Sequence, residues 1–495
     1  MVAIVAVVVA QWAAFPYLVG VFHDDGIYAL LARSIASGDG FHYSHLPGAP
    51  AAVHYPPLYP LLLAAAWRLA PAFPANVPVL LGLNVALVAA ASVGWFCFAT
   101  HQLDWRTTPA AVLALVATLA SPMLALAGAL LSEPLFLALL WPALLLAERA
   151  ARSPDARPVY GAGFAIGILM LVRTHALALL VGLVFVLAWR RRWRHACAAV
   201  GAAVLVQLPW LLWARAASPH VAAPLEGAYG SYGGWFLRGV QTGGFPFVTD
   251  TVRTNLGEAW LLLGDRMAMG LPATLHSVAV LAALLAAVSG GALLRHRAPV
   301  TVTFLLAYLA VVFVWPYSPW RFLWLVWPVL VLCISEGVRL GWTRGGRWRP
   351  VVALAAALPA VAYVRTELHA YASRAWRAPA RQAAAQIVPV IDWVRTHTAP
   401  GDVVLGEGEQ VIALYAGRRA APPLPFTARE YVVRPDDATE QAGLRAMLAA
   451  VPARYVVTLL PATLHAARTV ALTGQGLREI GPVPQSNAVA FEVVR

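Results

Sequence analysis

Two adjacent carboxylates, Asp24 and Asp25, stand where the first apolar run of the chain stops. Residues 1–22 carry no charged side chain, so the pair appears abruptly at a predicted membrane boundary. Ionisable groups are costly at such a boundary and are therefore candidates for function. Adjacent acids repel each other, which favours a raised pKa for one of them and suits a general base or a cation site. A simpler alternative stays open, in which either residue only caps a helix over 27–37.

The composition indicates that a membrane surrounds the elements that position this pair. Of 495 residues, 60% are hydrophobic and 12% are charged, whereas a soluble domain carries about 25% charged residues. We therefore predict an integral membrane protein with many spans. The net charge of +13 does not indicate nucleic-acid binding, because the arginines cluster in short loops between apolar runs. All three cysteines lie in apolar runs, so we expect neither a disulfide framework nor a zinc site.

Eleven apolar runs reach or approach the length of about 20 residues that a spanning helix needs. They cover 2–21, 76–100, 109–129, 133–148, 159–173, 175–189, 196–214, 271–294, 299–315, 322–340 and 350–364. The first run has no basic leader and no clear cleavage site, so we expect a retained helix rather than a signal peptide. A shorter run over 58–70 predicts an interfacial or re-entrant helix, and residues 26–37 predict a helix that lies flat on the membrane.

Arginine sets the predicted orientation. Five alternate loops carry arginine groups, and the positive-inside rule assigns their side to the cytoplasm. These groups are Arg106; Arg149, Arg152 and Arg157; Arg190, Arg191, Arg192 and Arg194; Arg295 and Arg297; and Arg344, Arg347 and Arg349. The N-terminus is then cytoplasmic. The opposite face receives Asp24, Glu133, Arg173, Arg321 and the C-terminal segment, so we expect any active site to face outward.

Two outer segments stand out by composition. Residues 215–270 are rich in glycine and aromatic residues, and the sequence leaves open whether they form a mobile cover or an aromatic belt at the interface. From about residue 366 onward, predicted strands at 402–405, 454–459 and 488–494 alternate with helices at 386–397, 409–415, 439–450 and 461–472. We therefore predict a membrane domain over 1–365, with a first outer loop at 22–57, and a soluble α/β domain over 366–495.

Several short motifs carry a resemblance to a known family. They are Asp24-Asp25-Gly26-Ile27-Tyr28-Ala29-Leu30-Leu31-Ala32-Arg33-Ser34, Gly38-Asp39-Gly40, Tyr55-Pro56-Pro57-Leu58-Tyr59-Pro60, Ser132-Glu133-Pro134-Leu135-Phe136, Arg321-Phe322-Leu323, Asp392-Trp393-Val394-Arg395 and Tyr415-Ala416-Gly417-Arg418-Arg419. In these motifs the chain resembles the GT-C fold membrane glycosyltransferases. The branch it resembles contains the bacterial protein O-mannosyltransferases and the lipid A aminoarabinose transferases (family 39-like). The family pair is more often Asp-Glu, and the tail lacks the oligosaccharyltransferase motif Trp-Trp-Asp-Tyr-Gly, which argues against that branch.

The resemblance implies an all-α polytopic membrane protein with a small extracytoplasmic α/β domain. It also implies an inverting transfer of a hexose or pentose from a polyprenyl-phosphate donor to a hydroxyl of a lipid, glycan or protein acceptor. Asp24 matches the family's base position, and Asp25 would orient it, bind the acceptor or hold a metal. Arg321, Arg173 and His54 would bind the donor phosphate. Substrate contacts would come from Glu133, Tyr28, Tyr55 and Tyr59. A divalent metal stays undecided.

Two other classes remain open on the sequence. A polytopic transporter or lipid flippase would also suit about eleven spans and outward carboxylates. Transporters, however, place ionisable groups near mid-membrane and often show two similar halves, and no duplication is visible here. A non-catalytic assembly subunit of the same fold is the third reading. The absence of lysine beside abundant arginine, alanine and proline is typical of GC-rich bacterial genomes, so we expect a multi-pass protein of the inner (plasma) membrane.

Overall fold

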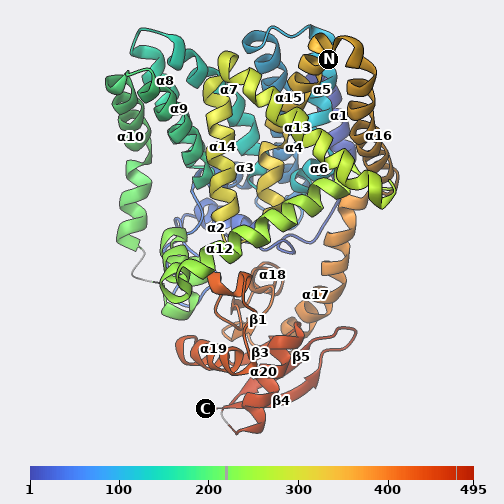
Figure 1. The fold of residues 1–495 in the computed structure, drawn as a ribbon. Helices are drawn as coiled ribbons and strands as arrows, with labels where there is room; N and C mark the ends of the chain where they lie inside the picture. Colours follow the sequence, from blue (N-terminus) through green and yellow to red (C-terminus); the bar gives the residue numbers. More distant parts are fainter. Residues whose placement is uncertain (218–220, 475, 495) are drawn as a thin grey trace.

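The computed structural model describes residues 1–217, 221–474 and 476–494. Within these residues, each of the eleven predicted apolar runs folds as one helix or one bent pair of helices, and together they form a bundle (Figure 1). The elements are α1 (Val2–Ala13), α4 (Val77–Cys97), α5 (Thr107–Thr118) with α6 (Ser121–Ala127), α7 (Glu133–Arg152), α8 (Arg157–Met170), α9 (Leu177–Trp189), α10 (Trp193–Ala217), α13 (Ala273–Arg297), α14 (Pro299–Val314), α15 (Trp320–Arg344) and α16 (Arg349–Ser373).

Not all of these helices have the length of a full span. Among the described residues, six helices are long and apolar enough to cross a membrane, and the pair α5 and α6, bent by 60°, makes a seventh. The elements α1, α8, α9 and α14 have only 12 to 16 residues. Helix α1 ends early because Phe15 precedes Pro16, and a residue before proline favours extended backbone. The chain is a multi-pass membrane protein, but fewer of its helices are full-length than the eleven runs predict.

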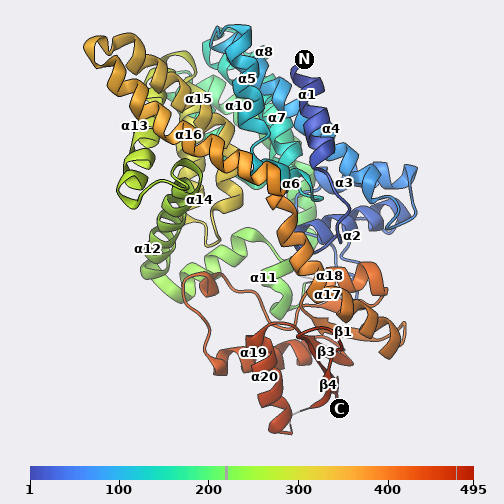
Figure 2. The ribbon, with the colours of Figure 1, turned by 90° about the vertical axis from the view of Figure 1, so that its right-hand side faces the viewer.

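Two short helices lie at the end of the bundle that faces the C-terminal sheet. Helix α2 (Asp24–Ser37) runs across this end of the bundle (Figure 2). Helix α3 (Leu58–Leu69) has 12 residues, which is too short for a span, and packs against α2. Both helices were predicted, and both bring polar residues of the first outer segment under the bundle.

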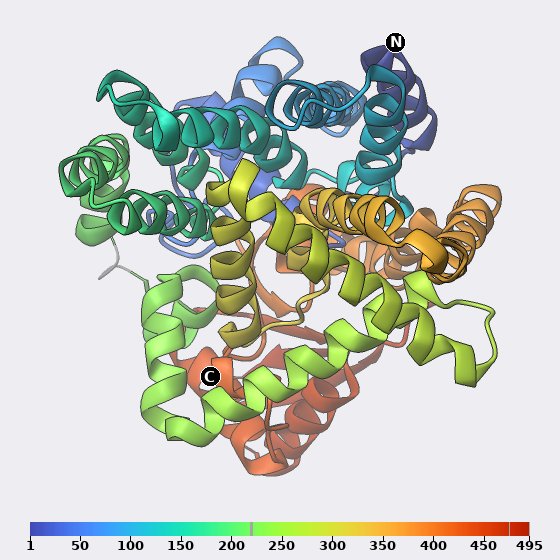
Figure 3. The ribbon, with the colours of Figure 1, turned by 45° about the horizontal axis from the view of Figure 1, so that its top comes forward.

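The predicted outer loop at 215–270 is largely helical, which corrects that expectation; residues 218–220 lie outside the described part. Short turns (η4, Ala223–Leu225, and α11, Glu226–Tyr229) lead into α12 (Tyr232–Met267), which runs along the rim of the bundle beside α13 and α14 (Figure 3). Gly244 leaves helical geometry at φ 62° and ψ −156°, so α12 is two helices joined at a kink. Trp235, Phe247 and Asn255 are buried along it. Burial of this face outweighs the weak helix propensity of its glycines, each a cost of about 1 kcal/mol.

The C-terminal segment folds as a small five-stranded sheet with helices on both faces. Its strand order is β2-β1-β3-β5-β4, in which β1 pairs in parallel with β2 and β3, and β5 pairs antiparallel with β3 and β4. The elements are α17 (Ala378–His397), β1 (Val403–Gly406), α18 (Glu409–Val411), η7 (Ile412–Ala416), β2 (Arg419–Ala421), η8 (Ala428–Tyr431), α19 (Asp437–Ala450), β3 (Tyr455–Thr458), α20 (Pro461–Leu472), β4 (Leu477–Pro482) and β5 (Val489–Val493).

Successive side chains of the inner strands point to opposite faces of the sheet, and each face is covered by its own layer of helices. Val404 of β1 packs with α17 and η7, whereas Leu405 packs on the opposite face with α19 and α20. The predicted strands correspond to β1, β3 and β5. Strands β2 and β4 were missed, because β2 has three residues and β4 is a largely exposed edge strand without an apolar face.

The arginine-rich loops meet at the end of the bundle opposite this sheet. Arg190 Nη1 donates to the Ala151 carbonyl oxygen at 2.6 Å, and Arg297 pairs with Asp104 at 2.6 Å. Arg152 also donates to Gln102. The loops that follow α4, α7, α9 and α13 therefore lie at one end, as the alternation of arginine groups predicts. Helix α16 begins at that end and leads to α17 and the sheet (Figures 1 and 2).

Candidate functional site

Four charged side chains that are far apart in the sequence meet where the bundle faces the C-terminal sheet. Arg321 donates from Nη1 to Asp24 Oδ2 and from Nη2 to Glu133 Oε1, both at 2.7 Å. Arg173 Nη1 lies 3.0 Å from the same Glu133 oxygen. The side chain of Glu133 is fully buried, whereas those of Asp24 and Arg321 keep 22% and 19% of their surface exposed. The cluster thus has a buried anchor and an open end.

Helix starts position this cluster. Asp24 is the first residue of α2, Glu133 is the first residue of α7, and Arg321 is the second residue of α15. Arg173 directly precedes η2 (Thr174–Ala176). Helix N-termini carry a partial positive charge and unpaired N–H groups, which favour carboxylates and phosphates nearby. Three segments therefore direct their first charged residues, together with Arg173, to one place.

Asp24 is held as a carboxylate. The hydroxyl of Tyr55 donates to Asp24 Oδ1 at 2.9 Å, and Arg321 occupies the other oxygen. Burial raises the pKa of Asp24, but the positive charge of Arg321 outweighs burial and lowers this pKa to about 2. Asp24 is therefore ionised at neutral pH and has one face open.

Asp25 lies apart from the charged cluster. It is fully buried and accepts hydrogen bonds from the backbone N–H groups of Gly20, at 2.8 Å, and Phe22, at 3.0 Å. Burial raises its pKa to about 6, so desolvation is the main cause of the raised pKa, where the sequence suggested repulsion by Asp24. Asp25 closes the turn that leads into α2.

The predicted tyrosines form a packed row beside the acids. The ring of Tyr28 lies edge-on to those of Tyr55 and Tyr59, with centroids 5.1 and 5.0 Å apart. The hydroxyl of Tyr28 lies 3.1 Å from Ser132 Oγ, which also accepts from Arg173. Of the three tyrosines, Tyr55 reaches the open carboxylate, and Tyr28 connects to Arg173 through Ser132.

Tyr59 serves a different contact, which points into the bundle. Its hydroxyl donates to Asn84 Oδ1 at 3.0 Å, and Asn84 Nδ2 donates to the Ala129 carbonyl oxygen at 2.6 Å. Tyr59 is fully buried. Tyr59 therefore links α3 to α4 and, through Asn84, to the turn before α7. It does not contact the Asp24 carboxylate.

His54 packs next to the site. Its Nδ1 lies 2.7 Å from the Gly230 carbonyl oxygen, and its ring contacts Tyr232 with centroids 3.8 Å apart. Burial lowers the pKa of His54 to about 4, so the ring is neutral at pH 7 and adds no positive charge for a phosphate. The structure brings Asp24, Arg321, Arg173 and Glu133 together, and places His54 in the adjacent aromatic wall.

The carboxylates present do not make a metal site as they stand. Across residues 1–217, 221–474 and 476–494, no group of three or more His, Cys, Asp or Glu side chains is placed to hold an ion. Asp24 is already paired with a guanidinium, and both oxygens of Asp25 accept backbone hydrogen bonds. A divalent cation would have to displace these partners.

Polar residues of the C-terminal segment approach the turn that leads into α2. Sequence reasoning did not select these residues. Glu409 Oε1 accepts from the hydroxyl of Tyr229 at 2.7 Å and lies 3.8 Å from His23 Nδ1. Gln410 contacts Gly20. The only local signal was a Gly-Glu-Gly-Glu run over 406–409, which has no recognisable motif spacing.

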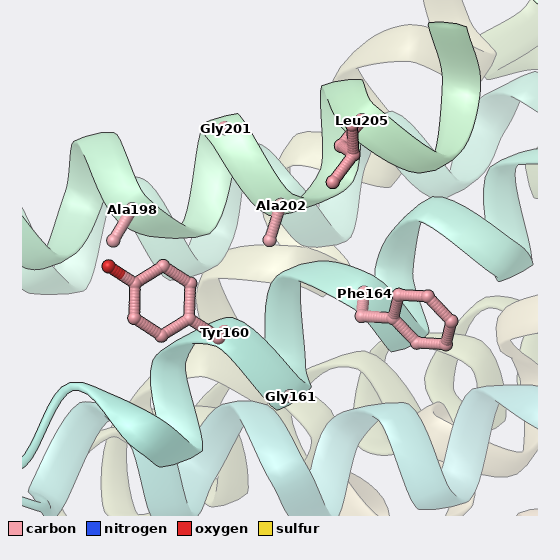
Figure 4. Close-up of a pocket in the computed structure, with 7 residues that line it drawn as sticks. All are labelled: Tyr160, Gly161, Phe164, Ala198, Gly201, Ala202 and Leu205. Atoms are coloured by element: carbon pink, nitrogen blue, oxygen red, sulfur yellow. The ribbon is translucent and has the colours of Figure 1, made fainter. Parts of the chain in front are cut away.

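An apolar hollow elsewhere on the described surface lies between α8 and α10 (Figure 4). Tyr160 and Phe164 of α8 face Ala198, Ala202 and Leu205 of α10, and no charged side chain lines the hollow. Phe164 and Leu205 are more than half exposed. This surface is suited to contact with hydrocarbon, and Tyr160 carries the only polar side-chain group among the residues that line it.

The fold has a counterpart among solved membrane glycosyltransferases. The crystal structure of the Archaeoglobus fulgidus oligosaccharyltransferase, in complex with Zn and sulfate, superposes with a TM-score of 0.55 at 14% sequence identity. The match covers 92% of this chain and 68% of that chain. The chain has the GT-C fold.

The predicted fold class is thereby confirmed. ArnT from Cupriavidus metallidurans, solved with undecaprenyl phosphate, also matches, with a TM-score of 0.47 and 15% identity over 99% of this chain and 97% of that chain. No protein-family model matches the sequence, and no curated protein matches it either.

Proposed function

We propose that the protein is an inverting glycosyltransferase that moves a sugar from a polyprenyl-phosphate donor to an acceptor hydroxyl on the extracytoplasmic face of the membrane. The observation that carries this proposal is the cluster of Asp24, Arg321, Glu133 and Arg173. It places an ionised, partly open carboxylate beside two guanidinium groups. The reaction needs a base for the acceptor hydroxyl and positive charge for the leaving phosphate, and this cluster supplies both.

Asp24 acts as the base in this proposal. The acceptor oxygen attacks the anomeric carbon while its proton passes to Asp24. The bond between that carbon and the phosphate oxygen breaks on the opposite face of the sugar, and its electron pair leaves with the polyprenyl phosphate. Attack from the opposite face inverts the anomeric carbon. General-base catalysis of this kind contributes roughly 10²- to 10⁴-fold to a rate.

Arg321 and Arg173 receive the phosphate. Guanidinium groups offer paired N–H donors that match phosphate oxygens. Arg321 is the more exposed of the two, and it is shared between Asp24 and Glu133. A carboxylate with a pKa of about 2 is a weak base. When the donor phosphate binds Arg321, Asp24 loses the partner that most stabilises its ionised form. The pKa of Asp24 then rises, and Asp24 becomes a stronger base.

A divalent metal has no step in this mechanism. The oligosaccharyltransferase of the same fold was crystallised with Zn. In this chain the two adjacent acids have different partners. Asp24 pairs with Arg321, and Asp25 accepts hydrogen bonds from backbone N–H groups. These residues do not fit an ion in the arrangement described.

The remaining parts of the proposal concern the place of the reaction. The arginine-rich loops would face the cytoplasm, as would the N-terminus, and the sheet at the opposite end would be extracytoplasmic. The donor would enter from the bilayer of the inner membrane, and the acceptor would be a lipid, glycan or protein. We propose a membrane domain over 1–365 and a soluble domain over 366–495; α16 continues past this boundary to Ser373.

Mass spectrometry of lipids that co-purify with Asp24→Asn tests the proposal. A blocked transferase should retain a polyprenyl phosphate that carries a pentose or hexose mass, and that mass would name the sugar class. Asp39→Asn is the matched control, because Asp39 is an exposed acid of the same outer segment that contacts only its own turn. Repeated recovery of bulk phospholipid alone from Asp24→Asn would contradict the donor assignment and favour a transport assay.

A further inference from the structure

The turn that carries Asp24 is contacted by the C-terminal segment. Gln410 Nε2 donates to the carbonyl oxygen of Gly20 at 2.6 Å, and the backbone N–H of Val19 donates to the hydroxyl of Tyr415 at 3.0 Å. Gln410 is 3% exposed. Asp25 accepts from the N–H of the same Gly20. The N–H of Gly20 is therefore held by a neighbour in sequence, and its carbonyl oxygen accepts from the N–H of His23, at 3.1 Å, and from Gln410, 390 positions away.

Glycine makes this contact sterically possible. A Cβ atom added to Gly26 would lie 2.3 Å from Gln410 Cγ, and one added to Gly20 would lie 2.7 Å from Val411 Cγ2. Gly20 also has φ +106°, which favours glycine. The turn and α18 fit closely enough that no side chain could stand between them.

Glu409 makes a second contact between the C-terminal segment and the chain next to Asp24. Its Oε1 accepts from the hydroxyl of Tyr229 at 2.7 Å, and His45 Nε2 lies 3.0 Å from that hydroxyl. His23, which precedes Asp24, has φ +62° and lies 3.8 Å from Glu409. A non-glycine residue with positive φ persists only where its surroundings hold it. Glu409 thus links His23 to Tyr229 of α11, whose hydroxyl also contacts His45.

The position of these residues in the sheet supports a role in the site. Helix α18 follows the carboxyl end of β1, and β1 lies between β2 and β3 with the next helices on opposite faces. In open α/β sheets this edge is where ligands usually bind. In this chain the turn at 19–26 lies at this edge of the sheet.

We propose that Gln410 and Glu409 are positioning residues for Asp24, so that the C-terminal sheet completes the transferase site. The inference rests on the proposed function. Gln410 acts through Gly20 and Glu409 through His23, and neither contacts Asp24 or Arg321 by hydrogen bond. Displacement of a reacting group by about 1 Å can cost roughly 100-fold in rate, so loss of either contact lowers kcat while the phosphate-binding arginines stay in place.

Gln410→Met is the decisive variant. Methionine keeps the length of the side chain but cannot donate to Gly20, and it also removes Gln410 Oε1, which is buried without a partner. We expect kcat to fall roughly 10- to 100-fold, with the donor KM and the thermal midpoint unchanged. Gln441→Met, the same change on α19 of the same sheet, should match wild type.

A companion pair tests Glu409. Glu409→Ala should lower kcat in the same way, and Glu409→Gln should restore most of it, because glutamine still accepts from Tyr229. A wild-type kcat in both Gln410→Met and Glu409→Ala would overturn the inference.

Hydrogen–deuterium exchange separates this inference from the proposed function. Amides of residues 19–26 should exchange faster in Gln410→Met and stay as in wild type in Gln441→Met. Unchanged exchange of this peptide in Gln410→Met overturns the positioning role even if the protein transfers no sugar. Failure of wild type to bind polyprenyl phosphate or transfer sugar, with faster exchange in Gln410→Met, contradicts the proposed function but leaves the contact established.

Discussion

A single residue, Arg321, decides how reactive the proposed base is. It forms hydrogen bonds to both Asp24 and Glu133, so the acid at the open end is stabilised in its ionised form. Among the residues that the structure describes, Glu133 has a second cation in Arg173, whereas the only side chain besides Arg321 that forms a hydrogen bond to the Asp24 carboxylate is Tyr55. A phosphate that competes for Arg321 therefore takes it from Asp24 more easily than from Glu133.

Asp24→Asn should bind polyprenyl phosphate more tightly than wild type while it loses turnover. Removing the carboxylate frees Arg321 for the ligand, and we expect roughly tenfold higher affinity, or about 1.4 kcal/mol. Titration of purified protein in detergent or vesicles with polyprenyl phosphate measures this. Tyr55→Phe is the control, because it removes the other contact to Asp24 and leaves the ion pair. Equal affinity of Asp24→Asn and wild type would refute competition for Arg321.

Asp25 should give stability a distinct pH dependence. Its pKa is raised from the usual value near 3.8 to about 6, so the folded protein binds this proton more tightly than the unfolded chain. Its contribution is fully present below about pH 4 and is lost as pH rises through about 6. Thermal midpoints measured between pH 4 and pH 7 should fall less steeply in Asp25→Asn than in wild type. Asp39→Asn should keep the wild-type slope; an identical slope in Asp25→Asn would contradict the assignment.

At the scale of elements, the site depends on where helices begin. Glu133 stands at the start of α7 because the turn before it is tied to α4. Asn84 donates to the Ala129 carbonyl oxygen of that turn and accepts from Tyr59 of α3. All of these groups are buried, so the Tyr59 hydroxyl depends on Asn84 for its hydrogen bond, whereas the Ala129 carbonyl oxygen accepts from Asn84 and from the N–H of Leu131.

Asn84→Ala should destabilise the protein. It removes the hydrogen-bond partner of the Tyr59 hydroxyl and one of the two donors to the Ala129 carbonyl oxygen, which keeps the N–H of Leu131. A buried hydroxyl left without its partner costs about 1–3 kcal/mol. The thermal midpoint should fall, and turnover should fall with it because Glu133 is no longer held in place. Gly82→Ala, two residues earlier on α4, is the control, since the added Cβ meets no atom within 4 Å. A midpoint equal to that of Gly82→Ala would show that the link is dispensable.

At the scale of the whole molecule, the arginine-rich loops and the C-terminal sheet lie at opposite ends of the bundle (Figure 1). The charged cluster lies at the sheet end, where the turn at 19–26 meets α18. The orientation of the chain in the membrane therefore decides which compartment supplies the acceptor.

Cysteine labelling in intact cells tests this orientation. In a variant without Cys97, Cys197 and Cys333, Arg468→Cys on α20 should react with an impermeant thiol reagent added outside. Asp155→Cys, in the loop between α7 and α8, should react only after the membrane is opened. Both positions have exposed side chains. The reverse pattern would place the site in the cytoplasm and remove the outer-face proposal.

The sequence alone determined the fold class of the protein, and it singled out the residues of the candidate site. Apolar runs separated by arginine predict helices because the membrane leaves a backbone few other ways to satisfy its hydrogen bonds, and each run is helical in the structure. Asp24 and Glu133 were selected because charges at membrane boundaries are costly. Arg173 and Arg321 were selected because the family resemblance implies a phosphate ligand, and all four side chains meet.

Only the tertiary structure decided which of two adjacent acids faces the open side. Asp24 and Asp25 are alike in sequence, and the difference between them comes from Arg321 and from the N–H groups of Gly20 and Phe22. The helical form of 232–267 and the contact of Gln410 with Gly20 were likewise not predictable, because both depend on partners distant in the chain. The local pattern of apolar and charged residues indicates which segments lie in the membrane. The partner of each charged side chain depends instead on packing between segments that are hundreds of residues apart.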